Sequence, residues 1–385
     1  MPESPAFPTL TWTEADRVHT ARWRSENGAA VPSQVVVAGD QTRADDALRI
    51  ARSGGVLLWR GDFHSARLLL QAMGRRLDRA AGGRRGAVSE ANGGAVTDLF
   101  HRNRQAQAQR SRLLSALTMV LEADYALDLR RAPDLRLACE EAYGAPDGQT
   151  SVVSLRELLG LVGAHEWRKK GVPIPAVGGR IHAHYGVFSP VRGEYIDLVA
   201  AADLPSRTLA FDIGTGTGVL ACVLAQRGVQ RIVATELDAR ALACAADNLQ
   251  RLGFAGQVEL TKADLFPPGR APLVVCNPPW LPGKPSSSIE HAIYDPDSRM
   301  LRGFLRGLAA HLTPGGQGWL ILSDLAEHLG LRRREELLEW IDHAGLRVLA
   351  CPTILPRHPK AADVADALHA ARSAEVTALW QLVVK

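Results

Sequence analysis

The stretch Phe211–Ala225, FDIGTGTGVLACVLA, indicates how the C-terminal half of this chain folds. A short apolar strand ends at Asp212, three glycines follow at alternate positions, and an apolar helix then begins. Glycine permits a tight turn and a close backbone approach, and the first turn of the helix offers unpaired N–H groups to a polar ligand. The spacing G-x-G-x-G differs from the G-x-G-x-x-G that is typical of dinucleotide sites.

From about residue 206 onward, short apolar strands alternate with amphipathic helices. The helical patterns run near 217–227, 239–252, 299–312 and 332–344, and the strand patterns are TLAFD, RIVATE, QVELTKAD, PLVVCN, QGWLILS, LRVLAC and ALWQLVV. Such alternation builds a parallel sheet with helices on both faces, and ligands bind at the carboxyl ends of its strands. We therefore predict a doubly wound α/β sheet of seven strands with a site along one edge.

Acidic residues stand at the ends of the next two strands. Glu236 lies 24 residues after Asp212, where a carboxylate can accept hydrogen bonds from both hydroxyls of a ribose. Asp264 ends the third strand, where a carboxylate can accept from an adenine amino group; a plain turn-forming Asp is the alternative. Asp238 is adequately explained as the N-cap of the following helix. The loop and the two acids thus indicate a nucleoside-containing ligand.

The fourth strand runs into Asn277, Pro278, Pro279 and Trp280. Consecutive prolines stiffen the backbone and remove two N–H donors, so that nearby carbonyl groups remain as fixed acceptors. The side-chain oxygen of Asn277 is a second acceptor, and the flat ring of Trp280 can stack on a planar group. Together they suit the NH2 of an amide or an aromatic amine, and they would orient its nitrogen toward an electrophilic carbon. This pattern predicts a nitrogen-alkylating site.

In this order and spacing, FDIGTGTG, ATELDARAL, ADLF and NPPW resemble the class I S-adenosylmethionine-dependent methyltransferases, specifically the small-domain group with an Asn-Pro-Pro-aromatic motif. The resemblance covers about 170–385. It implies S-adenosyl-L-methionine as cofactor, direct methyl transfer without a metal, and a catalytic turn formed by Asn277, Pro278, Pro279 and Trp280. The cofactor-binding residues that it implies are Asp212, Gly214, Thr215, Gly216, Gly218, Glu236, Asp264 and Asn277.

Two flanking segments bear on the substrate. GVFSPVRGEYIDLV resembles the segment before the cofactor loop in glutamine-modifying members, which makes Arg192 and Glu194 candidates for shaping the site; a surface salt bridge is the alternative. IYDPDSRML is similar to the Tyr-Glu-Pro segment of glutamine methyltransferases, with Asp295 in place of Glu. We expect the acceptor to be a protein glutamine amide, slightly preferred, or an exocyclic amine of an RNA base; a small-molecule amine is a third option.

Residues 1–165 are predicted to form a smaller α/β domain for substrate recognition. Its patterns are a strand at SQVVVAG, a helix at 43–52, a strand at GVLLWRG, a helix at FHSARLLLQAMGRRL, a loop at 80–94 and a long helix from about 98 to 122. In size and character it resembles the extra domain of ribosomal RNA guanine-N2 methyltransferases. Residues 166–200 are predicted to form a hairpin and connecting segment, and 201–385 the methyltransferase domain.

The net charge of +4 is unevenly distributed, because 75–112 holds nine arginines against three acidic residues. This stretch is either a phosphate-facing patch or a solvated helix surface. With 46% apolar and 22% charged residues, no apolar run of roughly 18 residues and no secretion signal, we expect a soluble cytoplasmic protein without membrane partners. The five cysteines lack C-x-x-C spacing, and His182 and His184 have no carboxylate cluster beside them, so no metal site is predicted.

Two other classes of function fit the motifs less well. A non-catalytic nucleic-acid or partner-binding module would not need both a complete cofactor loop and the Asn-Pro-Pro-Trp turn. A nicotinamide-dependent oxidoreductase would have a different glycine spacing and no use for Asn277–Trp280. Binding of S-adenosylmethionine, measured by calorimetry, separates the first of these classes from an enzyme.

Overall fold

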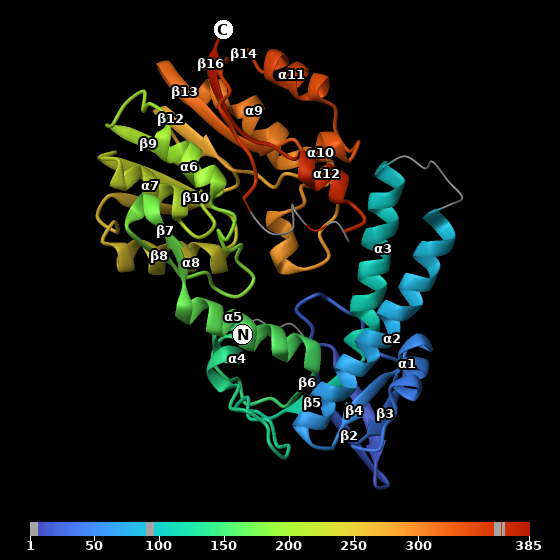
Figure 1. Ribbon diagram of the computed structural model, residues 1–385. Helices are drawn as coiled ribbons and strands as arrows, with labels where there is room; N and C mark the ends of the chain where they lie inside the picture. Colours follow the sequence, from blue (N-terminus) through green and yellow to red (C-terminus); the bar gives the residue numbers. More distant parts are fainter. Residues whose placement is uncertain (1–6, 90–95, 358–362, 364–365) are drawn as a thin grey trace. The chain divides into compact units, whose positions relative to one another are not determined.

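A computed structural model describes residues 7–89, 96–357, 363 and 366–385 of the chain. These residues form two compact units, each with its own main sheet (Figure 1). The N-terminal unit comprises the residues up to 94 and His101–Glu166, and the C-terminal unit comprises 95–100 and Trp167–Lys385. None of the helices in the described ranges combines the length and the hydropathy that a bilayer crossing requires.

The N-terminal unit is built on six strands in the order β1-β2-β6-β5-β4-β3. β4 lies between β3 and β5 and runs parallel to both, so helices connect these strands, and every residue of β4 and β6 is buried. The predicted α/β character is confirmed. The elements are β1 (Thr9–Glu14), β2 (Arg17–Trp23), β3 (Val35–Ala38), α1 (Ala44–Arg52), β4 (Val56–Trp59), α2 (Phe63–Ser89), α3 (Val96–Leu114), β5 (Leu117–Leu121), α4 (Arg136–Tyr143), β6 (Ser151–Ser154) and α5 (Leu155–Lys170).

Two sequence-based predictions for this part of the chain are wrong. The loop predicted at 80–94 is helical as far as Ser89, where α2 ends, and its later residues lie outside the described ranges. Ala and Arg favour helix and each glycine costs only about 1 kcal/mol, so a helix that has already formed continues through them. The helix predicted from 98 to 122 ends at Leu114, because Leu117–Leu121 pairs as β5 between β4 and β6. Pairing with neighbouring strands decides the state of that apolar run.

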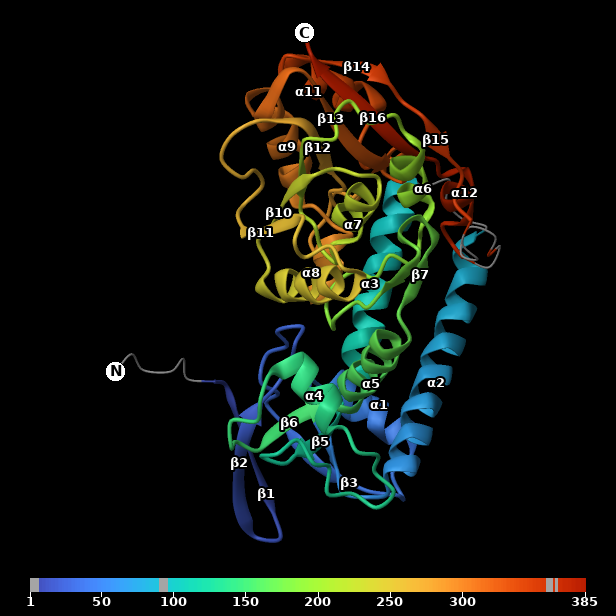
Figure 2. The same cartoon turned by 90° about the vertical axis from the view of Figure 1, so that its left-hand side faces the viewer.

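The C-terminal unit is built on a sheet in the order β11-β10-β9-β12-β13-β16-β14, with the short β15 paired to β16 outside this order (Figure 2). The predicted doubly wound sheet of seven strands is confirmed. One detail differs from the expected parallel sheet, because β16 runs antiparallel to both of its neighbours. The strands are β9 (Leu209–Ile213), β10 (Arg231–Glu236), β11 (Val258–Lys262), β12 (Ala271–Cys276), β13 (Leu312–Ser323), β14 (Leu346–Ala350), β15 (Thr353–Ile354) and β16 (Thr377–Val384).

Helices cover both faces of this sheet. Residues of α6, α7 and α8 pack into one buried apolar cluster, and residues of α9 and α11 pack into another. A hairpin of β7 (Val172–Ile174) and β8 (Gly179–Ile181) precedes α6. The remaining elements are η1 (Pro175–Val177), α6 (Glu194–Ala201), α7 (Val219–Gln226), α8 (Ala239–Leu252), η2 (Ser288–Ala292), η3 (Pro296–Ser298), α9 (Arg299–His311), α10 (Leu325–His328), α11 (Arg334–His343) and α12 (His369–Ala374).

The order of the strands creates a binding crevice at β9. This strand lies between β10 and β12 and is parallel to both. The chain leaves β9 toward β10 and β11, and it then returns to the other side of β9 with β12. At such a switch point the loops that follow neighbouring strands diverge and leave room for a ligand. The segments after β9, β10, β11 and β12 carry the predicted motifs, and they meet at this edge.

Candidate active site

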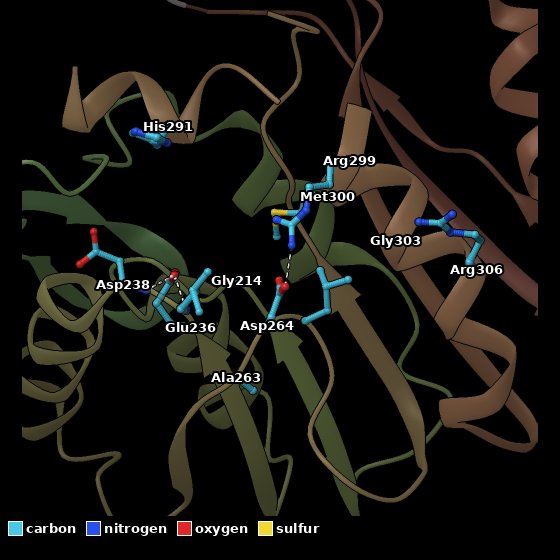
Figure 3. Close-up of a pocket in the computed structure, with 12 residues that line it drawn as sticks. Gly214, Glu236, Asp238, Ala263, Asp264, His291, Arg299, Met300, Gly303 and Arg306 are labelled. Atoms are coloured by element: carbon cyan, nitrogen blue, oxygen red, sulfur yellow. Dashed lines mark hydrogen bonds and ion pairs between the residues drawn. The ribbon is translucent and has the colours of Figure 1, made fainter. Parts of the chain in front are cut away.

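A cavity of about 460 Å³ lies at this edge of the sheet (Figure 3). Residues that follow β9, β10 and β11 form one side, and residues of η2 and α9 form the other. Of the predicted cofactor-binding residues, the cavity brings together Gly214, Glu236 and Asp264. Its lining residues are Gly214, Glu236, Leu237, Asp238, Ala263, Asp264, Leu265, His291, Arg299, Met300, Gly303 and Arg306.

The glycine loop adopts a backbone that requires glycine. Gly214, Gly216 and Gly218 have φ values of 71°, 56° and 80°, in the left-handed region that side chains disfavour. The N–H groups of Gly214 and Thr215 both donate to the carbonyl of Thr235 in β10 at 2.9 Å. These bonds fasten the loop to the neighbouring strand, so its shape is set by the sheet itself.

Glu236 ties the end of β10 to this loop. One carboxylate oxygen accepts the Gly216 N–H at 3.1 Å, and the other accepts the N–H groups of Leu237 and Asp238 at 2.8 and 3.1 Å. Three backbone donors thus fix the orientation of the carboxylate, which lines the cavity. Asp238 accepts hydrogen bonds from the N–H groups of Arg240 and Ala241, which confirms the N-cap prediction.

Asp212 lies beneath the loop and does not line the cavity. Its side chain is buried, and the Thr215 hydroxyl donates to it at 2.6 Å. Burial raises the pKa of Asp212 to about 6, against the opposing effect of the hydrogen bonds from Thr215 and from the Ala221 N–H. Asp212 and Thr215 therefore support the loop from below.

Asp264 and Arg299 form an ion pair at the cavity. The guanidinium donates to the Asp264 carboxylate at 2.6 Å, and both side chains are more than half exposed (Figure 3). The next residue, Leu265, has φ of 76°, which is rare for a branched side chain, and its carbonyl accepts the hydroxyl of Thr235. Thr235 thus holds the glycine loop through its carbonyl and the Asp264–Leu265 turn through its hydroxyl.

The Asn277–Trp280 turn follows β12 at the same edge. The indole N–H of Trp280 donates to the side-chain oxygen of Asn277 at 2.9 Å. Pro278 is buried, the other three residues are partly buried, and the Trp280 ring packs against both apolar clusters of the sheet. The sequence predicted an acceptor and a stacking ring as separate groups, but the structure joins the two through this hydrogen bond.

Asp295 lies four residues before helix α9 and does not line the cavity. Its buried carboxylate accepts the N–H groups of Met300 and Leu301 at 2.9 and 3.0 Å. Burial raises the pKa of Asp295, while these two hydrogen bonds act in the opposite direction. Met300 itself lines the cavity, so Asp295 contacts the segment that forms the cavity wall.

Arg192 and Glu194 contact other segments and do not line the cavity either. Arg192 forms an ion pair of 3.2 Å with Glu375, whose buried carboxylate also accepts the Ser323 hydroxyl. Glu194 is buried and accepts the backbone N–H of Arg357 at 2.8 Å. The salt bridge given as the alternative is present at Arg192, but its carboxylate partner is only 1% exposed, so the pair does not lie wholly on the surface.

The two histidines of RIHAHYG have separate partners. The Nδ1 of His182 lies 2.6 Å from the Arg168 carbonyl, and the Nε2 of His184 lies 3.3 Å from the Asp247 carboxylate. Both side chains are partly buried. Among the described residues, no group of three or more His, Cys, Asp or Glu side chains is arranged to hold a metal ion.

The arginine-rich stretch is partly neutralised within the N-terminal unit. Arg76 pairs with Asp45 at 2.6 Å, and Arg110 pairs with Asp78 at 2.9 Å. These surface pairs favour the solvated helix surface over the phosphate-facing patch at those two arginines.

The α9 side of the cavity was not predicted from the sequence. Arg299 and Arg306 line it, and Arg302 lies between them in the sequence at helical spacing, with its guanidinium over the Trp340 ring. A signal was present, because RMLRGFLRGLAAH has three arginines and no acid. Without the fold, nothing in that spacing shows that the helix faces the cavity.

A doubly wound sheet with a glycine loop after its first strand and a fixed acid after its second defines an α/β domain that binds a nucleoside-containing ligand at its switch point. Residues 178–334 match the family model described as methyltransferase small domain. The C-terminal unit is thus a class I methyltransferase domain of this group, as the sequence motifs predicted.

Similar proteins carry related names. A release factor glutamine methyltransferase of Cereibacter sphaeroides is 32% identical over 42% of this chain and 62% of its own length. A tRNA1(Val) (adenine(37)-N6)-methyltransferase of Pedobacter heparinus is 32% identical over 31% of this chain and 57% of its own length. The chain therefore spans less than two thirds of these relatives. A solved methyltransferase from Thiobacillus denitrificans, in complex with S-adenosyl-L-homocysteine, is 17% identical, with a TM-score of 0.34 over 51% of this chain and 92% of its own.

Proposed function

We propose that this chain is an S-adenosylmethionine-dependent N-methyltransferase that acts on a planar nitrogen of a macromolecule. One observation carries the proposal: the glycine loop after β9, the Glu236 carboxylate after β10 and the Asn277–Trp280 turn after β12 meet at one edge of one sheet. The first two suit the adenosine part of a cofactor, and the third suits a planar amide or amine.

The cavity residues fit S-adenosylmethionine. A Cβ added to Gly214 would lie 2.6 Å from the Met300 Cε, so a residue without a side chain keeps this part of the cavity open. The Glu236 carboxylate would accept hydrogen bonds from the ribose hydroxyls, and Asp264 would accept from the adenine amino group on releasing Arg299. When bound, the cofactor supplies an electrophilic methyl group on a positively charged sulfur.

Asn277 would hold the acceptor nitrogen. Its side-chain oxygen has two lone pairs, of which Trp280 uses one, so the second can accept from the NH2 of the substrate. The nitrogen gains positive charge as its bond to carbon forms, and a fixed carbonyl oxygen stabilises that charge. The Pro278 and Pro279 peptides lack N–H groups and present only acceptors there.

A protein glutamine amide is the acceptor that we propose first. Two relatives named release factor glutamine methyltransferase are 32% and 36% identical over 178 and 163 residues. An amide NH2 is a weak nucleophile, and paired acceptors at the Asn277–Trp280 turn would increase its electron density and fix its direction.

An exocyclic amine of an RNA base is the second candidate, and a specific observation favours it. The α9 side of the cavity is basic, with Arg299 and Arg306 as lining residues and no acid in the helix. Clustered arginines attract and position phosphates, which a glutamine peptide lacks. For either acceptor, we propose that 1–165 recognise the substrate, that 201–385 carry out transfer, and that the reaction takes place in the cytoplasm.

The experiment that tests the proposal measures tritium transfer from labelled S-adenosylmethionine into an extract of cells that lack this protein. Samples are then treated with protease or ribonuclease, and Asn277→Ala serves as the control. Loss of macromolecular label to protease indicates a protein amide, and loss to ribonuclease indicates an RNA base. If no label is incorporated and calorimetry detects no cofactor binding, the chain is a non-catalytic module and the proposal is wrong.

A further inference from the structure

The first turn of α3 belongs structurally to the methyltransferase unit. Residues 96–100 of α3 group with the C-terminal unit, whereas the rest of α3 groups with the N-terminal unit. Phe100 is only 3% exposed, although Val96 and Leu99 on the same helical turns are 46% and 37% exposed. One side of this turn is therefore buried among residues that lie far away in the sequence.

Phe100 contributes to a small apolar cluster, which we call the α3 anchor cluster. Its other buried members come from 281–371 of the same unit, and Ile293, Tyr294 and Leu331 pack against the cluster from partly buried positions. The buried members are Phe100, Leu281, Leu325, Ala326, Leu329, Leu368 and Ala371.

A hydrogen bond adds to this packing. The Thr97 hydroxyl donates to the carbonyl of Leu329 at 2.9 Å. The approach is close, because a Cβ added to Gly330 would lie 2.5 Å from the Thr97 hydroxyl oxygen. A side chain at position 330 would also be strained, since Gly330 has φ of 67°. Polar and apolar contacts thus both fix the first turn of α3 to the methyltransferase unit.

Leu281 connects the α3 anchor cluster to the Asn277–Trp280 turn. It follows Trp280 directly, its N–H donates to the Ile293 carbonyl at 3.1 Å, and its own carbonyl accepts the Asp295 N–H at 2.8 Å. Its side chain is buried in the cluster. Leu281 directly follows the Asn277–Trp280 turn. Its backbone is therefore held by the segment before α9, and its side chain is held by the cluster that contains Phe100.

We propose that Phe100 and Thr97 are positioning residues that set the geometry of the Asn277–Trp280 turn. This inference rests on the proposed function of that turn. A smaller side chain at position 100 leaves space in the cluster that holds Leu281, and the turn that Leu281 follows then loses its fixed position. A site completed in this way is not formed by 167–385 alone, since it needs a segment that precedes 101 in the chain.

Fluorine NMR of the full chain labelled with 5-fluorotryptophan tests this directly and needs no substrate. The chain has eight tryptophans, and the resonance of Trp280 is the one that disappears in Trp280→Phe. We expect Phe100→Ala to shift or broaden this resonance, Phe100→Leu to restore it, and Leu99→Ala to leave it unchanged. Thr97→Val, which removes the hydroxyl but keeps the shape, should shift it in the same direction, and Thr97→Ser should not.

Kinetics supply the second measurement. Because small misplacements of a reacting group cost large factors in rate, we expect Phe100→Ala to lower tritium transfer into the extract about ten-fold or more. Calorimetric affinity for S-adenosylmethionine should change less than about two-fold, since the α3 anchor cluster contains none of the cavity-lining residues. Leu99→Ala should transfer at the wild-type rate.

Different results would refute the positioning role of Phe100 and the proposed function. An inactive wild type that binds no cofactor refutes the proposed function, whatever the fluorine spectra show. An active wild type whose Trp280 resonance is unchanged in both Phe100→Ala and Thr97→Val refutes the positioning role. If Phe100→Ala does not fold, the spectra of Thr97→Val and Phe100→Leu test the positioning role. Neither substitution removes the apolar contact of residue 100 with the α3 anchor cluster.

Discussion

The indole N–H of Trp280 donates a hydrogen bond of 2.9 Å to the side-chain oxygen of Asn277, three residues earlier in the chain. An amide side chain can turn its oxygen or its nitrogen toward a partner, and only the oxygen accepts from an indole. Trp280 therefore selects the orientation of the Asn277 amide before any substrate arrives. A phenylalanine or tyrosine ring in this position would offer no such N–H group.

Trp280→Phe isolates this hydrogen bond, because it keeps an aromatic ring and removes the N–H. We expect methyl transfer to fall about two- to ten-fold, which corresponds to one neutral hydrogen bond. Affinity for S-adenosylmethionine should stay the same, since Trp280 does not line the cofactor cavity. Single-turnover transfer and calorimetry measure the two quantities, and equal activity of Trp280→Phe and the wild type would show that Asn277 needs no orienting partner.

Asn277→Ala should lower methyl transfer more than Trp280→Phe does. It removes the acceptor for the substrate nitrogen, and the loss of one transition-state hydrogen bond lowers turnover by roughly 10²-fold. Cofactor affinity should change little. A parallel loss of turnover and cofactor affinity would instead assign Asn277 to the cofactor site alone.

Glu236→Ala should weaken cofactor binding by about 1–3 kcal/mol, because the hydrogen bonds to the ribose are lost. Part of this loss will come from the glycine loop, since the Gly216 N–H loses its acceptor in the same variant. Glu236→Gln keeps a side-chain oxygen and is expected to fall between Glu236→Ala and the wild type. Calorimetry with S-adenosylhomocysteine measures the series, and unchanged affinity in Glu236→Ala would remove this residue from the site.

Arg299→Ala should strengthen binding of S-adenosylmethionine about two- to five-fold, the scale of an exposed ion pair. The substitution frees the Asp264 carboxylate and removes a positive charge beside a positively charged ligand. S-adenosylhomocysteine lacks the sulfonium charge, so its affinity should rise less. Arg302→Ala is the matched control, because Arg302 lies on the same helix and does not line the cavity. Equal gains for both ligands would contradict the electrostatic explanation.

Asp212 should make the stability of the C-terminal unit depend on pH. Its pKa is raised to about 6 by burial, so the stabilisation from the neutral carboxyl is complete below about pH 4 and is lost as the pH rises through 6. From the shift between 3.8 and about 6, the loss is on the order of 3 kcal/mol. Asp212→Asn should therefore gain stability relative to the wild type between pH 4 and pH 8. Chemical denaturation at both values measures this difference, and a constant difference would refute the raised pKa.

Sequence patterns correctly predicted the features that are determined by residues close together in the chain. The glycine loop, the Asp238 cap and the strand that ends at Glu236 are local features, and the structure shows each where the pattern predicted it. Alternating strands and helices also gave the doubly wound sheet, because each short apolar strand needs helices to bury both of its faces.

Other features depend on contacts between distant residues and could not be read from the pattern. Leu117–Leu121 became a strand because β4 and β6 offered pairing partners. Arg299 reached Asp264, 35 residues earlier, and Glu375 reached Arg192, 183 residues earlier, only after the chain had folded. Such pairs follow from tertiary structure. The sequence therefore marked Arg192 as a candidate site residue but could not show that it contacts Glu375.

The position of β16 in the sheet determines when the last strands can pair as the chain is synthesised. β16 lies between β13 and β14 in the sheet but follows both of them in the chain, and it is the strand with which β14 pairs. On the ribosome, β14 therefore emerges before its partner strand, and the edge of β13 that pairs with β16 still has unpaired backbone N–H and C=O groups. The sheet closes only when 377–384 is also available to pair, so until then the facing edges of β13 and β14 remain open to pairing with other chains.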